Sequence, residues 1–202
     1  MKDDGKQRRL PTQTLARVAV FAALIAVLGL PGQLTVFGNV VPITLQTLGV
    51  MLAGAILGSW RAALAVLVLL VLVAVGLPLL AGGRGGLGVF VGPSAGYLAG
   101  WLFGAAATGW LVERAGRDPG LISLFVACVV GGIGVVYLFG VPVQSMITGV
   151  SLGQAAWLSL GFLPGDLIKA VLAAAVVRGT QRAYPDAVPA VHAERMRAAR
   201  ER

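Results

Sequence analysis

The 202-residue sequence contains very few of the residues that enzymes and metal sites use. It has one cysteine, Cys128, and one histidine, His192. A single cysteine cannot form an internal disulfide bond, and this pair of residues does not make a metal cluster. Cys128 lies in an apolar run and is expected to pack there, whereas His192 lies in a polar tail. We therefore expect no metal, no cofactor and no enzyme activity, and in particular no membrane protease, which would need a histidine within the membrane.

Charge is also scarce. Only 12% of the residues are charged and 57% are hydrophobic, with a mean hydropathy of +0.88, whereas soluble domains carry about 25% charged residues. The net charge of +8 would suit nucleic acid, but the basic residues lie at the two ends and in short loops between apolar runs. This placement is typical of membrane orientation and of contact with anionic lipid. We expect an integral membrane protein in the lipid bilayer and no nucleic-acid partner.

Six apolar runs predict an all-α membrane protein with six transmembrane helices. The runs are 15–30, 43–57, 62–80, 94–112, 120–139 and 162–177. We read 1–13 as a basic N-terminal segment, 14–178 as the membrane domain and 179–202 as a basic cytoplasmic tail. Residues 141–154 are expected to be a long connection, followed by a short helix at 155–160. The first run has the alternative of a signal peptide, but no clear cleavage site precedes Pro31 and more spans follow.

The positions of the basic residues predict the orientation. With six spans, 14 of the 16 lysines and arginines fall on one side, whereas Arg84 lies in an opposite loop and Lys169 lies within a span. Both termini are therefore expected to be cytoplasmic. The glycine-rich loop 81–93, Gln46 and the start of the sixth span then meet in the outer half, where we expect a ligand pocket.

Asp166 and Lys169 bring charge into the sixth span. They are three residues apart, so their side chains share one helix face. A charge near the membrane centre costs roughly 2.5–3.5 kcal/mol on insertion scales, so the two should face inward. They either form a structural pair between helices or bind a polar ligand.

Small residues predict where backbones approach closely. Gly96, Gly100 and Gly104 repeat at a spacing of four, which favours a close helix neighbour. Loop 81–93 is too rich in glycine for a regular helix but carries interleaved apolar residues. We interpret it as a structured outer loop over a cavity, with an ordinary surface loop as the alternative. The first span has an alanine face for another helix, or simply ordinary alanine content. Its members are Ala16, Ala19, Ala22, Ala23 and Ala26.

Three ordered segments resemble the BioY family. They are Val-Pro-Ile-Thr-Leu-Gln-Thr-Leu at 41–48, Gly-Gly-Leu-Gly-Val-Phe-Val-Gly-Pro-Ser-Ala-Gly-Tyr at 85–97 and Phe-Leu-Pro-Gly-Asp-Leu-Ile-Lys at 162–169. The resemblance extends from about Thr14 to Val177. It implies a six-helix, biotin-binding substrate component (S component) of an energy-coupling factor (ECF) transporter in a prokaryotic plasma membrane. An S component for another vitamin or small carboxylate is the alternative.

The family also implies partners. An ECF transporter has a transmembrane coupling subunit and two cytoplasmic ATPases, although some BioY proteins are thought to work without them, perhaps as homo-oligomers. The resemblance assigns docking of the coupling subunit to the alanine face of the first helix, through Ala19, Ala22, Ala23 and Ala26.

The residue chemistry suits biotin as the transported ligand. An ionised Asp166 only accepts hydrogen bonds, which suits the ureido N–H groups. Lys169 can donate to the ureido carbonyl, to the carboxylate or to Asp166, and Gln46 can donate and accept. Gly85, Gly86 and Gly88 would let the backbone approach the ligand. Phe90 and Tyr97 would pack against it, or fill the core.

Arg84 departs from the family pattern, in which smaller or amide residues are common at this position. As a cation at the pocket mouth it would meet the biotin carboxylate, or else it would be solvated. If an amide usually binds the ureido group there, that contact must differ in this chain.

Overall fold

The computed structural model describes residues 12–32, 41–116 and 118–184. Within these ranges every regular element is helical, and an isolated β-bridge joins Leu80 and Arg84. The elements are α1 (Thr12–Val27), α2 (Gln46–Leu57), α3 (Ser59–Ala74), η1 (Leu87–Phe90), α4 (Ala95–Arg114), α5 (Leu121–Val129), η2 (Val130–Val135), α6 (Val136–Thr148), α7 (Leu152–Ser159), η3 (Leu160–Phe162) and α8 (Leu163–Ala183).

The helices form six apolar rods of unequal length. Three are long enough to cross a bilayer: α4 with 20 residues, α5–η2–α6 with 28 and α7–η3–α8 with 32. Three are shorter: α1, α2 and α3 have 16, 12 and 16 residues. At about 1.5 Å per residue, 16 residues cover about 24 Å of the roughly 30 Å hydrocarbon core. Residues 28–32, after α1, and 75–86, after α3, are irregular chain.

The fifth and sixth rods extend further than the apolar runs predict. The expected long connection at 141–154 is wrong, because the helix continues through Pro142 to Thr148. Gly149 then ends it with a φ of 74°, and a capping box between Ser151 and Gln154 starts α7. Membrane helices tolerate an internal proline where neighbours satisfy the freed backbone groups. The short helix expected at 155–160 is present but starts at Leu152, and α8 continues past 178 to Ala183.

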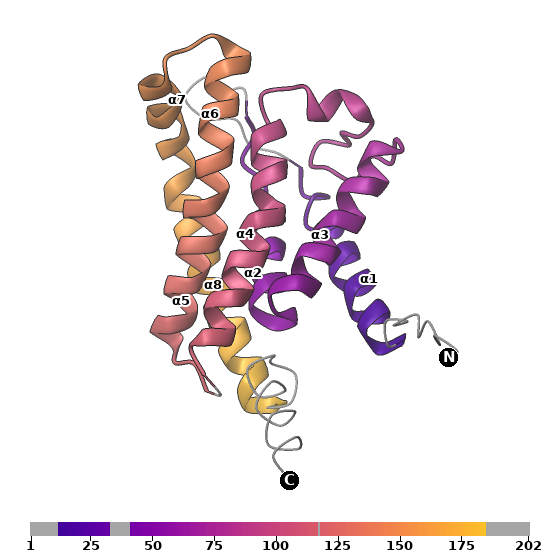
Figure 1. Ribbon diagram of the computed structural model, residues 1–202, viewed down its shortest axis with the longest axis vertical. Coiled ribbons are helices and arrows are strands. Elements are labelled where there is room, and N and C mark those ends of the chain that lie inside the picture. The colour runs from indigo at the N-terminus through magenta and orange to yellow at the C-terminus, as the bar shows by residue number, and fades with distance from the viewer. Residues whose placement is uncertain (1–11, 33–40, 117, 185–202) are drawn as a thin grey trace, which may run out of the picture.

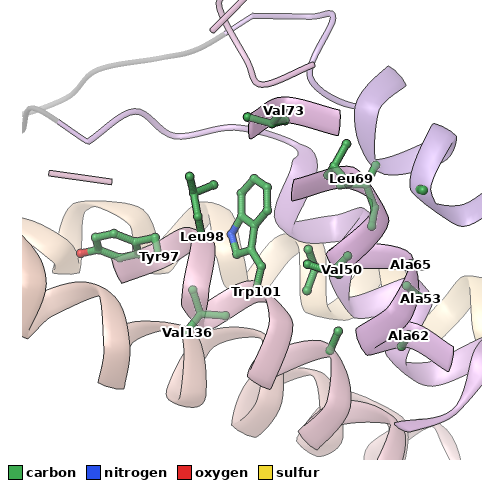
Figure 2. Close-up of a cluster of buried hydrophobic side chains, with 14 of the residues drawn as sticks. Val50, Ala53, Ala62, Ala65, Leu69, Val73, Tyr97, Leu98, Trp101 and Val136 are labelled. Carbon is green, nitrogen blue, oxygen red and sulfur yellow. The ribbon is translucent and has the colours of Figure 1, made fainter. Parts of the chain in front are cut away.

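α4 is the central helix, and its glycines allow two neighbours to approach, the α5–η2–α6 rod and the start of α3. A Cβ at Gly96, Gly100 or Gly104 would lie within 2.8 Å of a carbonyl oxygen on the α5–η2–α6 rod, so the predicted close approach is confirmed. On the other side, a Cβ at Gly109 would lie 2.4 Å from the amide nitrogen of Ser59. Around α4, the largest buried apolar cluster includes residues of α2, α3 and α6. Figure 2 shows Trp101 of this cluster between Leu98 and Val50.

The two ends of the bundle differ. The start of α1 and the ends of α4 and α8 lie at one end, and the loop between α3 and α4 lies at the other, with the α6–α7 turn (Figure 1). A cavity opens among the helices beside residues 41–44, which precede α2.

Candidate functional site

A cavity of about 540 Å³, including space open to solvent, lies beside the first turn of α2. Residues of α2, α4, α6 and α8 line it, together with Phe162 just before α8, residues 41–44 before α2, and Arg84 and Ser94 between α3 and α4. They are Val41, Pro42, Ile43, Thr44, Gln46, Thr47, Arg84, Ser94, Tyr97, Leu98, Trp101, Val136, Tyr137, Phe162, Asp166 and Lys169.

Asp166 and Lys169 form an ion pair in the wall of this cavity. The Lys169 Nζ lies 2.9 Å from the Asp166 Oδ1, and each residue is 4% exposed. Both stand on α8 one turn apart, and Pro164 occupies the first turn of that helix, where proline is well tolerated. The predicted inward orientation of both charges is confirmed.

The ammonium group of Lys169 is fully engaged by the protein. Its Nζ donates to the Thr44 carbonyl oxygen at 2.6 Å, to the Thr47 Oγ1 at 3.1 Å and to the Asp166 Oδ1 at 2.9 Å. A lysine has three N–H donors, so each donor has a partner. Lys169 therefore holds the first turn of α2 against α8.

The carboxylate of Asp166 keeps an acceptor position. Its Oδ1 accepts from Lys169 and from the Thr47 Oγ1 at 3.2 Å, and its Oδ2 accepts from the Tyr137 hydroxyl at 2.8 Å. A carboxylate offers about four lone-pair positions, and the described residues fill three. The fourth, on Oδ2, is available to an N–H donor in the cavity that Asp166 lines.

Aromatic rings form another part of the wall. Tyr97, Tyr137 and Phe162 meet edge to face, with ring centroids 6.0–6.4 Å apart, within the favourable range for such pairs. The Tyr97 hydroxyl is 2.8 Å from both the Gln144 Oε1 and the Ser159 Oγ. These buried partners fix the Tyr97 ring against the cavity.

Gln46 lines the cavity, but backbone groups occupy its amide. Its Nε2 donates to the carbonyl oxygens of Ile25, at 3.1 Å, and Leu79, at 3.0 Å. Its Oε1 accepts from the Ala81 amide at 3.0 Å. The side chain thus ties the end of α1 to the segment after α3, and in this arrangement it serves the scaffold instead of offering the expected free donor and acceptor.

Most of the glycine loop does not reach the cavity. Gly85, Gly86, Gly88 and Phe90 are absent from its lining, and Arg84 and Ser94 are the residues of 81–94 that line it. Close packing within the protein explains the glycine at position 85. A Cβ atom there would lie 2.3 Å from the Leu77 carbonyl oxygen. Gly86 has a φ of 80° and donates to the Val73 carbonyl oxygen at 2.7 Å. Gly85 and Gly86 thus fold the loop onto α3, and the close approach of the glycines to a ligand stays a prediction.

The alanines of α1 differ in exposure. Ala19 and Ala23 are exposed, Ala26 is half-buried, and Ala22 is 4% exposed in the core. Positions 19 and 23 are one turn apart, whereas position 22 is turned toward α2 and α3. Ala22 is therefore not available for docking, contrary to the expected set of four.

Sequence reasoning missed Tyr137, the aromatic partner of Asp166, and Trp101. Each lies in an apolar run where an aromatic residue gives no distinct signal. Thr44 and Thr47 are visible beside Gln46 as polar residues at the start of a span. Their spacing of three places both on one side of the first turn, but it does not show that α8 is the partner.

Fold and site together define a class of protein: a helical membrane protein with a pocket for a small polar molecule. The family model described as "BioY family" matches residues 3–186. The chain is 47% identical over 181 residues to "Biotin transporter BioY" of Rhizobium etli, covering 87% of this chain and 97% of the relative. It is 48% identical over 181 residues to the biotin transporter BioY of Rhodobacter capsulatus, covering 85% and 94%.

A solved structure agrees with these relatives. It is described as the "S-component for biotin from an ECF-type ABC transporter", and it matches with a TM-score of 0.81 and 31% identity over 90% of this chain and 95% of that one. The chain belongs to the BioY family.

Proposed function

We propose that this protein binds biotin with high affinity and mediates its uptake as the S component of an ECF transporter. The observation that carries the proposal is the buried carboxylate of Asp166, which lines the cavity with one acceptor position unfilled. Relatives that are named biotin transporters support it, as does the similarity to a biotin S component. No chemistry on the ligand is part of this function.

The ureido group of biotin fits this site. Its N–H groups are donors, and the open position on the Asp166 Oδ2 is an acceptor beside the Tyr137 hydroxyl. The aromatic wall of Tyr97, Tyr137 and Phe162 is apolar and suits the thioether ring. Because the protein already engages all three Lys169 donors, we assign Lys169 to holding Asp166 and the start of α2. We assign the ligand contact to Asp166.

Binding of biotin to purified protein in detergent tests the proposal, with desthiobiotin, lipoate and thiamine as competitors. We expect selective binding of biotin and its close analogues. Asp166→Asn should weaken binding more than tenfold, about 1.4 kcal/mol, because the amide presents a donor as well as an acceptor. Asp118→Asn is the matched control, since it makes the same change in an exposed ion pair. Selective binding of another vitamin would move the function to a different S component.

We also propose that the six rods cross the plasma membrane with both termini in the cytoplasm. The 14 basic residues at one side support this topology. Leu87 and Ala115 are exposed and lie in the two opposite sets of loops. With Cys128 replaced by alanine, a cysteine at 87 should react with an impermeant thiol reagent on intact cells, and a cysteine at 115 should not. The reverse result would invert the topology.

For the partners, we propose that a coupling subunit docks on the exposed positions Ala19 and Ala23 of α1. A phenylalanine at Ala19 should abolish uptake and co-purification with the coupling subunit and ATPases, yet leave biotin binding intact. Valine at Ala22 is a packing control, because that side chain lies in the core. Uptake by the chain alone, as an oligomer, would remove the need for these partners.

A further inference from the structure

Arg84 is an unpaired cation of the cavity. The structure describes three acidic residues, and each has other partners: Asp166 pairs with Lys169, Asp118 pairs with Arg178, and the Glu113 Oε1 accepts from the Ser59 amide at 3.0 Å. No described carboxylate lies within salt-bridge distance of the Arg84 guanidinium. The negative charge of Asp166 and the positive charge of Lys169 cancel. The side chains that line the cavity therefore carry a formal net charge of +1.

The loop fixes the Arg84 backbone. Leu80 and Arg84 exchange two backbone hydrogen bonds of 3.0 and 3.2 Å across a tight turn. Gly82 and Gly83 form that turn with φ values of 76° and 70°, which glycine adopts without strain. The turn is itself held in place, because the Ala81 amide donates to the Gln46 Oε1.

The side chain of Arg84 is also oriented. Its Nε donates to the Ala81 carbonyl oxygen and its Nη1 donates to the Ser94 Oγ, both at 3.2 Å. An arginine has five N–H donors, so one on Nη1 and both on Nη2 have no partner among the described residues. These three N–H groups form the edge of the guanidinium that can donate two parallel hydrogen bonds to one carboxylate.

Partial burial makes this free charge unfavourable without a ligand. It lowers the pKa of Arg84 from its ordinary value of 12.5, but the group stays charged at neutral pH. A neutral ligand would leave the +1 charge uncompensated, whereas a ligand with one negative charge would neutralise the site.

We propose that Arg84 makes this site selective for ligands that carry one carboxylate, by pairing its guanidinium with that group. This inference rests on the proposed binding of biotin and specifies the contact at the second end of the ligand. Asp166 then recognises the neutral N–H end, and Arg84 recognises the anionic end. The preference for a monoanion is a property of this chain's own residue 84.

The test compares biotin with its methyl ester, which has the same rings and chain but no charge. The unchanged protein should bind biotin at least tenfold more tightly than the ester. In Arg84→Gln, affinity for biotin should fall at least tenfold while affinity for the ester changes less than threefold. Retained ester binding also shows that the variant is folded. Arg84→Lys keeps the charge and should retain a preference for biotin.

The matched control is Arg114→Gln, at the far end of α4, which removes the same charge and should leave both affinities unchanged. Equal affinity of the unchanged protein for acid and ester would overturn the inference, although biotin binding itself would stand. A parallel loss of both ligands in Arg84→Gln would also overturn it, because Arg84 would then contact an uncharged part of the ligand. Absence of binding of either ligand to the folded, unchanged protein would instead refute the proposed function.

Discussion

Helix α8 carries one ion pair toward each end, and the two have opposite surroundings. Toward its start, Asp166 and Lys169 have side chains that are only 6% and 5% exposed. Near its end, Arg178 pairs with Asp118, which lies in the α4–α5 turn. The Asp118 side chain is 72% exposed. A basic residue of α8 is therefore paired with an aspartate twice, once in a cavity wall and once at the edge of the bundle.

The number of additional partners distinguishes the two pairs. Thr44, Thr47 and Tyr137 supply further hydrogen bonds to the buried pair. Around the exposed pair, Arg178 makes only long contacts of 3.4 Å to Pro119 and Gln181. Buried charges are no longer hydrated and need such hydrogen-bond partners, whereas water solvates the exposed pair. The buried pair is costly for a fold to maintain, which favours a role in ligand recognition over one in stability.

The largest expected effect comes from breaking the buried pair. Lys169→Met keeps much of the side-chain volume but leaves Asp166 without its counter-charge. Removing one partner of a buried pair costs about 3–5 kcal/mol, so thermal unfolding in detergent should occur at a clearly lower temperature. Biotin binding should fall as well, because the start of α2 loses its contact with α8.

A double variant separates charge from packing. Asp166→Leu together with Lys169→Met removes both charges, and it should recover much of the lost stability, because apolar replacements of buried pairs are often neutral or stabilising. Biotin binding should stay lost in the double variant. Recovery of binding together with stability would show that the pair serves only the fold.

A smaller effect is expected from Tyr137→Phe. This change keeps the ring among Tyr97 and Phe162 and removes the 2.8 Å hydrogen bond to the Asp166 Oδ2. Without this bond the carboxylate that the ligand is proposed to contact is held less firmly, so biotin affinity should fall roughly tenfold, about 1.4 kcal/mol. Titration calorimetry would measure the affinity. Tyr184→Phe, which alters an exposed tyrosine at the end of α8, is the matched control and should bind normally.

The sequence predicts the six apolar helices well because each coincides with a continuous apolar run. It misplaces their ends at positions where packing overrides a local signal. Pro142 predicts a connection, yet the fifth rod continues through it to Thr148. The basic tail from Arg178 is expected to be helical or disordered, and α8 continues into it to Ala183. Gly96, Gly100 and Gly104 are informative because a spacing of four has one simple cause, the close approach of another helix.

The site is predictable only in part. Asp166 and Lys169 stand out because charge is rare in an apolar run. The aromatic wall does not, since Tyr137 and Trp101 are ordinary members of such runs. Gln46 illustrates a different limit: its polarity in a span predicts a polar partner, but only the fold shows that the partners are the backbone groups of Ile25, Leu79 and Ala81.

The smallest expected effect is at the exposed pair. The hydrogen bond from Arg178 lowers the pKa of Asp118 below its ordinary value of 3.8. A lowered carboxyl pKa stabilises the fold at pH values above the unfolded-state pKa, and this stabilisation is lost as the pH falls through the folded-state value. Asp118→Asn should therefore lower the unfolding temperature only slightly at neutral pH, and the difference from the unchanged protein should shrink in strong acid. Biotin affinity should stay within twofold. A loss of binding as large as that of Asp166→Asn would mean that the far end of α8 is coupled to the cavity, and the contrast between the two pairs would fail.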